Sequence, residues 1–260
     1  MIHFYKFSES VLGPVPARDV YVKRGPGKGW PEECPPLRAA NGYGFDVLAN
    51  FDMDFRKKKD GSWTIVEDHE VTADWAFGGH VHDDSCDHDQ DEDDVEPVPL
   101  TQINAWFWEK DQKVPHVISR QVLKKISNQV KVSTYLYLAT DPGELIMMTD
   151  IPNRETPWRA LAAVIDTDWY PASYPWHAVL EFDRREKRVF IPKGTPICRL
   201  YVVPRGQHFA REMTQPGFDE YFARSQRWML ENGKGEPSGM MDITGAYVRQ
   251  QRRSRFDVIF

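Results

Sequence analysis

Residues 177–204 read HAVLEFDRREKRVFIPKGTPICRLYVVP and carry the strongest fold signal in the chain. They contain three short runs rich in β-branched and aromatic residues, HAVLEF, RVFI and ICRLYVVP. Such runs are typical of β-strands. Pro192-Lys193-Gly194 separates the last two runs, and this composition favours a tight turn. The stretch therefore predicts strands joined by short connections.

Similar runs recur along the rest of the chain. In the first hundred residues they are IHFYKF, FDVLANFDMDF and SWTIV, and Asp60-Gly61 predicts a hairpin tip before the third run. Later they are TQINAWFWEK, VSTYLYLAT and RALAAVIDTDW. The segment PHVISRQVLKKISNQ suits a helical turn or a strand.

Only one stretch, FDEYFARSQRWMLENG, has helical spacing of its apolar residues, and Gly233 follows it as a predicted stop. We therefore predict a mainly β fold, a β-sandwich or barrel-like and α+β at most, with a C-terminal helix over 215–232. We expect one β-rich domain over 1–260, with the helix packed against it and an acidic, His/Asp-rich loop insertion over 80–98.

The charge of the chain is unevenly distributed. The formal net charge is −6, but nine of the 39 acidic residues lie between positions 83 and 96. Without them the chain holds 30 acidic residues against 33 basic ones. This near-neutral body does not favour nucleic-acid binding.

The predicted location is cytoplasmic. No window approaches the roughly 18 consecutive apolar residues of a membrane helix. The start, MIHFYKFSES, lacks the layout of a secretory signal. Three widely spaced cysteines are an odd number and do not suggest a disulfide framework.

The acidic segment raises the question of a metal site. Residues 78–94 read GGHVHDDSCDHDQDEDD. His82 and Asp84, joined by His177, would form the two-histidine, one-carboxylate set of an Fe(II)/2-oxoglutarate-type oxygenase. However, a segment with so many like charges and so few apolar anchors favours solvation over a rigid metal centre. We predict an acidic loop and no cofactor, and the oxygenase is the alternative.

Several stretches resemble a family of bacterial and phage proteins, a domain of unknown function with no assigned chemistry. The resemblance covers roughly residues 35–56 and 132–230, and the stretch 57–131 is longer than the family requires. The family motifs are an Asn followed by a Gly-aromatic step, a Thr-Asp-Trp, a Lys-Gly-x-Pro turn and a strand ending Pro-x-Arg-Gly. The matching residues are Asn41, Gly44, Phe45, Thr167, Asp168, Trp169, Lys193, Gly194, Pro196, Pro204, Arg205 and Gly206.

A weaker resemblance concerns the layout of residues 177–204. This stretch is similar to the closing hairpin of the dUTPase and dCTP deaminase superfamily, in which a Gly turn leads into an Ile-x-x-Leu strand. Those enzymes usually have a glutamine where this chain has Arg199. The resemblance implies a shared β-hairpin and concerns fold class alone.

Nucleophilic catalysis has little support. Cys198 lies in an apolar strand and is expected in the core, and Cys34 has an acidic neighbour that disfavours a thiolate. The chain has no Gly-x-Ser-x-Gly elbow, phosphate loop or dinucleotide fingerprint.

The predicted ligand-binding residues are Asn41, Asp168, Trp169 and Trp176. A carboxylate beside large rings can hydrogen-bond a ligand while the rings stack on it. Asp168 could instead end a strand in an Asx-turn, with Trp169 in the core. The predicted function is small-ligand binding by a soluble β-domain, with catalysis undecided. The alternatives are the oxygenase and an interaction module that docks through the acidic loop.

Overall fold

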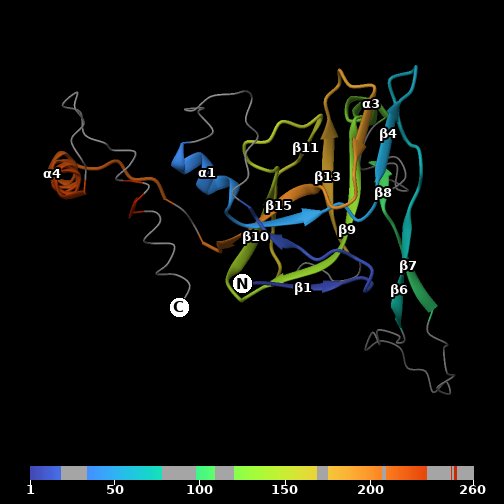
Figure 1. The fold of residues 1–260 in the computed structure, drawn as a ribbon, viewed down its shortest axis with the longest axis horizontal. Helices are drawn as coiled ribbons and strands as arrows, with labels where there is room; N and C mark the ends of the chain where they lie inside the picture. The colour runs from blue at the N-terminus through green and yellow to red at the C-terminus, as the bar shows by residue number, and fades with distance from the viewer. Residues whose placement is uncertain are drawn as a thin grey trace, which may run out of the picture. The chain divides into compact units, whose positions relative to one another are not determined.

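The computed structural model describes residues 1–18, 34–77, 98–108, 120–168, 175–206, 209–232, 247 and 249–250. The chain divides into two compact units. One comprises Met1–Arg18 and Tyr43–Arg205, and the other comprises Asp19–Gly42 and Gly206–Phe260. The first unit holds the strands, and the second holds the helices α1 (Pro35–Asn41) and α4 (Gln215–Asn232) (Figure 1).

Two five-stranded antiparallel sheets form most of the first unit. Sheet A has the order β1-β9-β13-β11, with β8 also paired to β9, and sheet B has the order β12-β10-β15-β3-β2. Sheet A consists of β1 (Ile2–Lys6), β8 (Ala105–Phe107), β9 (Gln129–Thr140), β11 (Trp158–Ala160) and β13 (Trp176–Phe182). Sheet B consists of β2 (Val15–Pro16), β3 (Phe45–Leu48), β10 (Glu144–Thr149), β12 (Ala163–Ile165) and β15 (Pro196–Pro204). The prediction of a mainly β fold is therefore confirmed.

Two smaller sheets complete this unit. Sheet C joins β14 (Arg188–Ile191), β4 (Met53–Lys57) and β5 (Trp63–Ile65). The other pairs β6 (Glu70–Phe77) with β7 (Val98–Ile103). A short helix, α3 (Arg120–Lys125), precedes β9 and lies within the segment 115–129, whose first five residues are outside the described ranges.

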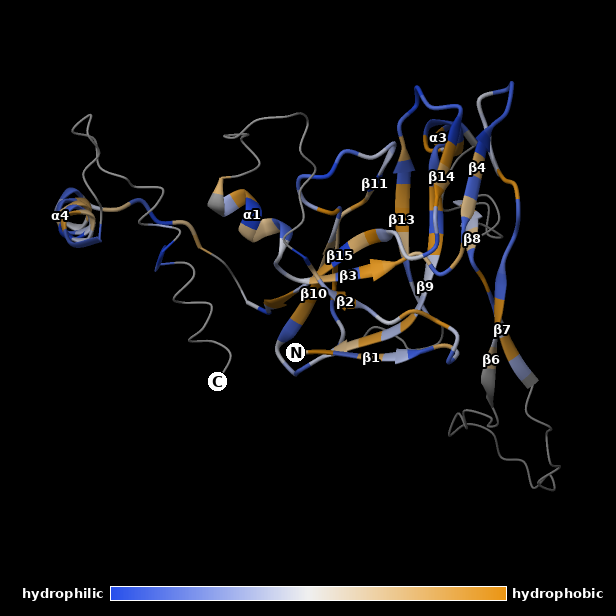
Figure 2. Ribbon diagram, viewed as in Figure 1, coloured by the Kyte–Doolittle hydropathy of each residue, from blue (hydrophilic) through white to orange (hydrophobic). Residues whose placement is uncertain are grey.

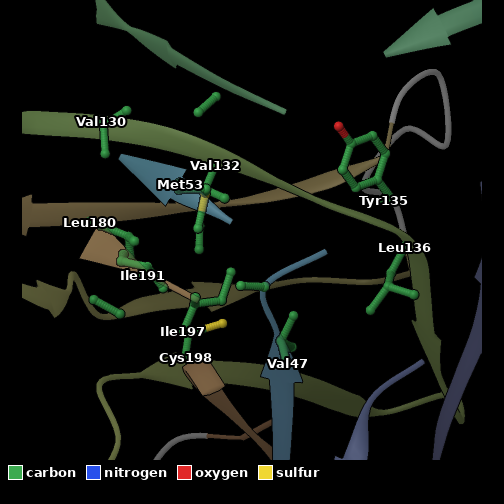
Figure 3. Close-up of a cluster of buried hydrophobic side chains, with 14 of the residues drawn as sticks. Val47, Met53, Val130, Val132, Tyr135, Leu136, Leu180, Ile191, Ile197 and Cys198 are labelled. Carbon is green, nitrogen blue, oxygen red and sulfur yellow. The ribbon is translucent and has the colours of Figure 1, made fainter. Parts of the chain in front are cut away.

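The core lies between the sheets. Alternate residues of a strand point to opposite faces, so Val130 and Val132 of β9 turn to the same side as their partners Leu180 and Ala178 of β13. Figure 3 shows these valines and Leu180 gathered with side chains of sheets B and C. The labelled members from those two sheets are Val47, Met53, Ile191, Ile197 and Cys198. Cys198 is fully buried, as its apolar strand predicted.

The stretch 177–204 does not form a hairpin. Its three strands enter three different sheets, because β13 pairs with β9, β14 pairs with β4, and β15 pairs with β10 and β3. The hairpin implied by the likeness to the dUTPase superfamily is therefore wrong, although the strands and the turn at Gly194, with φ of 80°, are present.

The physical reason is a corner shared by two chain segments. The predicted run 45–55 divides into β3 and β4. Its bend is hydrogen-bonded to the turn that joins β14 to β15. The amide of Gly194 donates to the carbonyl of Ala49 (2.8 Å), and the amide of Lys193 donates to Asp52 Oδ1 (2.7 Å). The two segments therefore pass side by side from sheet B to sheet C.

Other local predictions are confirmed. Strands β4 and β5 form the expected hairpin, and Gly61 at its tip has φ of 85°. The turns that follow β4 and β13 are hydrophilic (Figure 2). The predicted run 159–169 instead yields β11 and β12, which lie in different sheets, so reading it as one strand was wrong.

The second unit holds the predicted C-terminal helix, α4. It has no buried residues, and the exposed fractions of Phe218 and Phe222 are 46% and 51%. How it packs against the β-domain stays a prediction, and Gly233 lies outside the described residues. Within the described ranges, no helix has both the length and the apolar character needed to span a membrane.

Candidate functional site

The four predicted ligand-binding residues come from separate parts of the chain. Asn41 ends α1 and is buried in the second unit. Asp168 follows β12, whereas Trp176 begins β13 opposite Leu136. Trp169 lies outside the described residues. A pocket built from all four therefore stays a prediction.

Asp168 takes part in a surface ion-pair cluster. Its carboxylate lies 2.6 Å from the guanidinium of Arg205, which also contacts Asp166. The amide of Asp168 donates to Oδ1 of Asp166 (3.3 Å), so the Asx-turn here is made by Asp166. The cluster joins the Thr-Asp-Trp and Pro-x-Arg-Gly motifs and holds the end of β12 beside the end of β15.

The iron alternative rests mainly on residues outside the described ranges. His82 and Asp84 both lie there, as does nearly all of the acidic loop. Among the described residues, no group of three His, Cys, Asp or Glu side chains could hold a metal ion. His177 lies on β13, where it contacts Trp106 and Trp176. The metal set of His82, Asp84 and His177 stays a prediction.

A different cluster lies on the face of sheet A that points away from the core. Strand alternation places Lys131 of β9, Trp106 of β8 and His177 of β13 on this side, because their neighbours in sequence face the core. Trp108, just after β8, lies against the same lysine. We call the side chains of Trp106, Trp108, Lys131 and His177 the Lys131 face.

Lys131 is the central member of this face. The residue is only 8% exposed, and its Nζ atom lies 4.3 Å from the centre of the Trp108 ring. An ammonium over an indole face is attracted by the ring quadrupole. Burial lowers the pKa of Lys131, because removing the ammonium from water disfavours its charged form. Buried lysines with lowered pKa values are more frequent at functional sites.

His177 and Trp106 form the second half of the face. Their rings meet edge to face with centroids 5.4 Å apart, and Trp106 is 8% exposed. Burial, with a smaller contribution from the charge of Lys131, lowers the pKa of His177 to about 4. The imidazole is therefore uncharged at neutral pH. Within the described part of the chain, the buried indole Nε1 of Trp106 has no hydrogen-bond acceptor.

A hydrogen-bonded chain fixes the position of Trp108. Its Nε1 donates to Oε1 of Gln129 (3.2 Å), and Nε2 of Gln129 donates to Glu181 (2.9 Å). Arg159 donates to the other oxygen of Glu181 at 2.7 and 3.0 Å. An open cleft of about 280 Å³ lies beside the pair of Arg159 and Glu181, and it is lined by residues 156–159 and 181–183. The chain of side chains thus links the Lys131 face to a surface cleft.

The sequence prediction missed three members of this face, namely Lys131, Trp106 and Trp108. A lysine flanked by Val130 and Val132 normally marks the solvated side of a strand. The only sequence signal was the density of tryptophans in NAWFWEK, which by itself is more often core. These three side chains come together because β8 pairs with β9. Local sequence does not reveal pairing between strands that are far apart along the chain.

Comparisons with known proteins give no family for the chain. No family model matches the sequence, and no curated protein is significantly similar to it. Membership of the bacterial and phage family therefore stays a prediction.

Similar solved structures include a variant of the dUTPase from phage phi11 of S. aureus, with 7% identity and a TM-score of 0.34 over 83% of this chain and 97% of that one. Another is a variant of the Staphylococcus bacteriophage 80alpha dUTPase, with 8% identity and a TM-score of 0.34 over 83% and 89%. Likeness at this level carries no argument about function.

Proposed function

We propose that the protein binds a small, planar, oxygen-bearing ligand on the Lys131 face. The observation that carries this proposal is the burial of Lys131, whose amine lies over the ring of Trp108. Taking an ammonium out of water costs several kcal/mol on an order-of-magnitude scale. Lysines whose pKa is lowered by burial are found more often at functional sites, which supports a role for Lys131 in binding.

The chemistry of the face defines the kind of ligand. Indole rings offer flat apolar walls against which a planar ring can stack. The Lys131 amine and the Trp106 indole N–H are hydrogen-bond donors. A complementary ligand therefore has a flat apolar body and carboxylate or carbonyl oxygens. The uncharged imidazole of His177 adds a donor and an acceptor on the same side.

Benzoate is a suitable first probe because it combines one ring with one carboxylate. Saturation-transfer NMR should detect benzoate binding to the full chain and its loss in Lys131→Met. The matched control is Lys193→Met, which removes an exposed lysine from the turn before β15. Equal binding by the wild type and Lys131→Met, or no binding of benzoate and related aromatic acids by either, would overturn the proposal.

We also infer a cytoplasmic location and no role in nucleic-acid binding. The support is the pair of free cysteines, Cys34 and Cys198, together with the near-neutral body of the chain. The oxygenase and the acidic docking loop both depend on residues 80–96, which lie outside the described residues. Deleting that segment tests both alternatives, because it removes His82, Asp84 and the acidic residues of the predicted docking loop.

A further inference from the structure

We propose that two copies of this chain associate through the outer edge of β1, which pairs antiparallel with β1 of the second copy. Sheet A then continues from one copy into the other. The strand lies at the margin of sheet A beside β9 (Figure 1). The inference does not depend on the ligand proposed above.

The outer edge of β1 carries unpaired backbone groups. The strand pairs with β9 alone, over all five of its residues and without a bulge. The amide of Phe7, the next residue, donates to the carbonyl of Tyr135 in β9 (2.8 Å). Because successive amides of a strand point to opposite sides, the backbone groups of Ile2, Phe4 and Lys6 are turned away from β9. Within the described ranges, these outward groups have no hydrogen-bond partner.

The opposite edge of sheet A, formed by β11, is protected by side chains. The pairing of β11 with β13 turns the amide of Ala160 and the carbonyl of Trp158 away from the sheet. Asp150 Oδ1 accepts from the amide of Ala160 (3.2 Å), and the hydroxyl of Thr156 donates to the carbonyl of Trp158. Uncapped edges are templates for pairing with another chain. In the part of the chain that the structure describes, β1 is therefore the edge of sheet A that is open to a further strand.

The side chains of β1 are complementary to those of a second β1. When two strands IHFYK run antiparallel about a two-fold axis at Phe4, each Phe4 lies opposite the other. Ile2 then lies opposite Lys6, and His3 lies opposite Tyr5. Opposed residues share one face of a sheet, so the two Phe4 rings meet and no lysine faces another lysine. This register pairs every residue of β1, whereas a shift in either direction shortens the pairing.

Phe4 supplies the apolar contact of this interface. It lies opposite Leu138 of β9, which packs against the core, yet 48% of Phe4 is exposed. Phe4 of the second copy would cover this apolar surface, which favours association. Lys6, the one lysine or arginine in β1, already donates to the carbonyl of Glu9 (2.8 Å). The edge therefore presents an aromatic centre to its partner, as a second copy requires, and no charged pattern that would select a different peptide.

Sedimentation velocity on the full chain tests the inference. A reductant is present because Cys34 is an exposed thiol. Pairing over one short strand forms a smaller interface than the roughly 1,600 Å² of a standard stable complex. We therefore expect a monomer at low micromolar concentration and a dimer at submillimolar concentration. A wild type that stays monomeric throughout would overturn the inference and leave an extended segment of another protein as the partner to seek.

Two matched variants locate the contact. Phe4→Lys places two ammonium groups opposite each other and should weaken association by about tenfold or more. Val164→Lys is the control, because Val164 is 65% exposed on β12, an edge strand of sheet B, and should leave association unchanged. Association that survives Phe4→Lys, or that is lost in Val164→Lys, would overturn the inference.

Amide hydrogen exchange in the wild type gives a readout that does not depend on how a variant folds. The outward amides of Phe4 and Lys6 should exchange rapidly in dilute protein and slowly in concentrated protein. The amides of His3 and Tyr5, which point toward β9, should exchange slowly in both. If the outward amides exchange at the same rate at both concentrations while a dimer forms, the dimer contact lies elsewhere and the inference is wrong.

Discussion

The Nζ atom of Lys131 lies 4.3 Å from the centre of the Trp108 ring, on the side of sheet A opposite the core. This contact brings a cation into a largely buried environment. Ion–ring attraction contributes about 0.5–2 kcal/mol to holding the ammonium there. Lysines whose pKa is lowered by burial are found more often at functional sites, which is the reason for assigning Lys131 a role in binding.

Replacing Lys131 by Met should therefore leave the free energy of unfolding unchanged or raise it by about 1 kcal/mol. The long apolar side chain keeps the packing against Trp108 and removes the buried charge. Urea unfolding followed by circular dichroism measures the difference, with Lys193→Met as the control. A loss of more than about 2 kcal/mol would assign Lys131 to folding and remove the argument for a functional role.

The pH dependence of stability should report on His177. Its folded-state pKa of about 4 is below the ordinary value of 6.5, so the unfolded chain binds more protons between these values. The contribution of His177 to the free energy of unfolding is complete above pH 6.5 and is lost as the pH falls toward 4. The pKa difference corresponds to at most about 3 kcal/mol, which partial solvent access reduces to roughly 2 kcal/mol.

His177→Gln should accordingly lose less stability than the wild type between pH 7 and pH 4.5. Urea unfolding of both proteins at the two pH values gives the comparison. The contributions of the carboxylates that both proteins share cancel in the difference. Identical losses would mean that His177 is not desolvated in the folded protein.

Gly44 should be intolerant of a side chain. Its φ is 93°, and an added Cβ would lie 2.6 Å from the carbonyl oxygen of Leu200 and 2.9 Å from the ring of Tyr201. Gly44→Ala should reduce the free energy of unfolding by more than about 2 kcal/mol. Gly61→Ala is the matched control, because its φ is 85° but its Cβ would meet nothing within 4 Å. Equal effects of the two variants would mean that β3 is not this close to β15.

The buried pair of Asp46 and Arg199 should behave as a unit. Nε of Arg199 donates to Oδ1 of Asp46 (2.8 Å) across β15 and β3, and both residues are buried. Removing the Asp46 charge breaks its hydrogen-bonded pair with the buried Arg199, so Asp46→Asn should cost about 3 kcal/mol. The double variant Asp46→Leu with Arg199→Met should regain most of that loss. Equal stability of Asp46→Asn and the wild type would contradict the burial of this pair.

The positions of most strands along the chain could be predicted from the sequence, but β2, β6 and β10 were missed, and the partners of the strands could not be predicted. Local composition reveals a run such as RVFI, because β-branched and aromatic residues suit a pleated surface. It does not say that β14 pairs with β4 rather than with its sequence neighbours. That choice depends on the corner in which Ala49 and Asp52 accept hydrogen bonds from Gly194 and Lys193, and Asp52 and Lys193 are about 140 residues apart in sequence.

The candidate site was less predictable for the same reason. Of the Lys131 face, only His177 was identified from sequence, as an alternative metal ligand. Lys131 lies in another strand, where its alternation with Val130 and Val132 indicates a solvated position. That position is instead buried, where β8 and β13 pair on either side of β9.

The most direct test of ligand binding is a titration with benzoate followed through the indole N–H resonances of the protein. Assignment of Trp106 and Trp108 by single Phe substitutions makes the signals specific. We predict that these two resonances shift with benzoate in the wild type and do not shift in Lys131→Met. Shifts confined to other tryptophans, or equal shifts in the two proteins, would contradict a binding site on the Lys131 face.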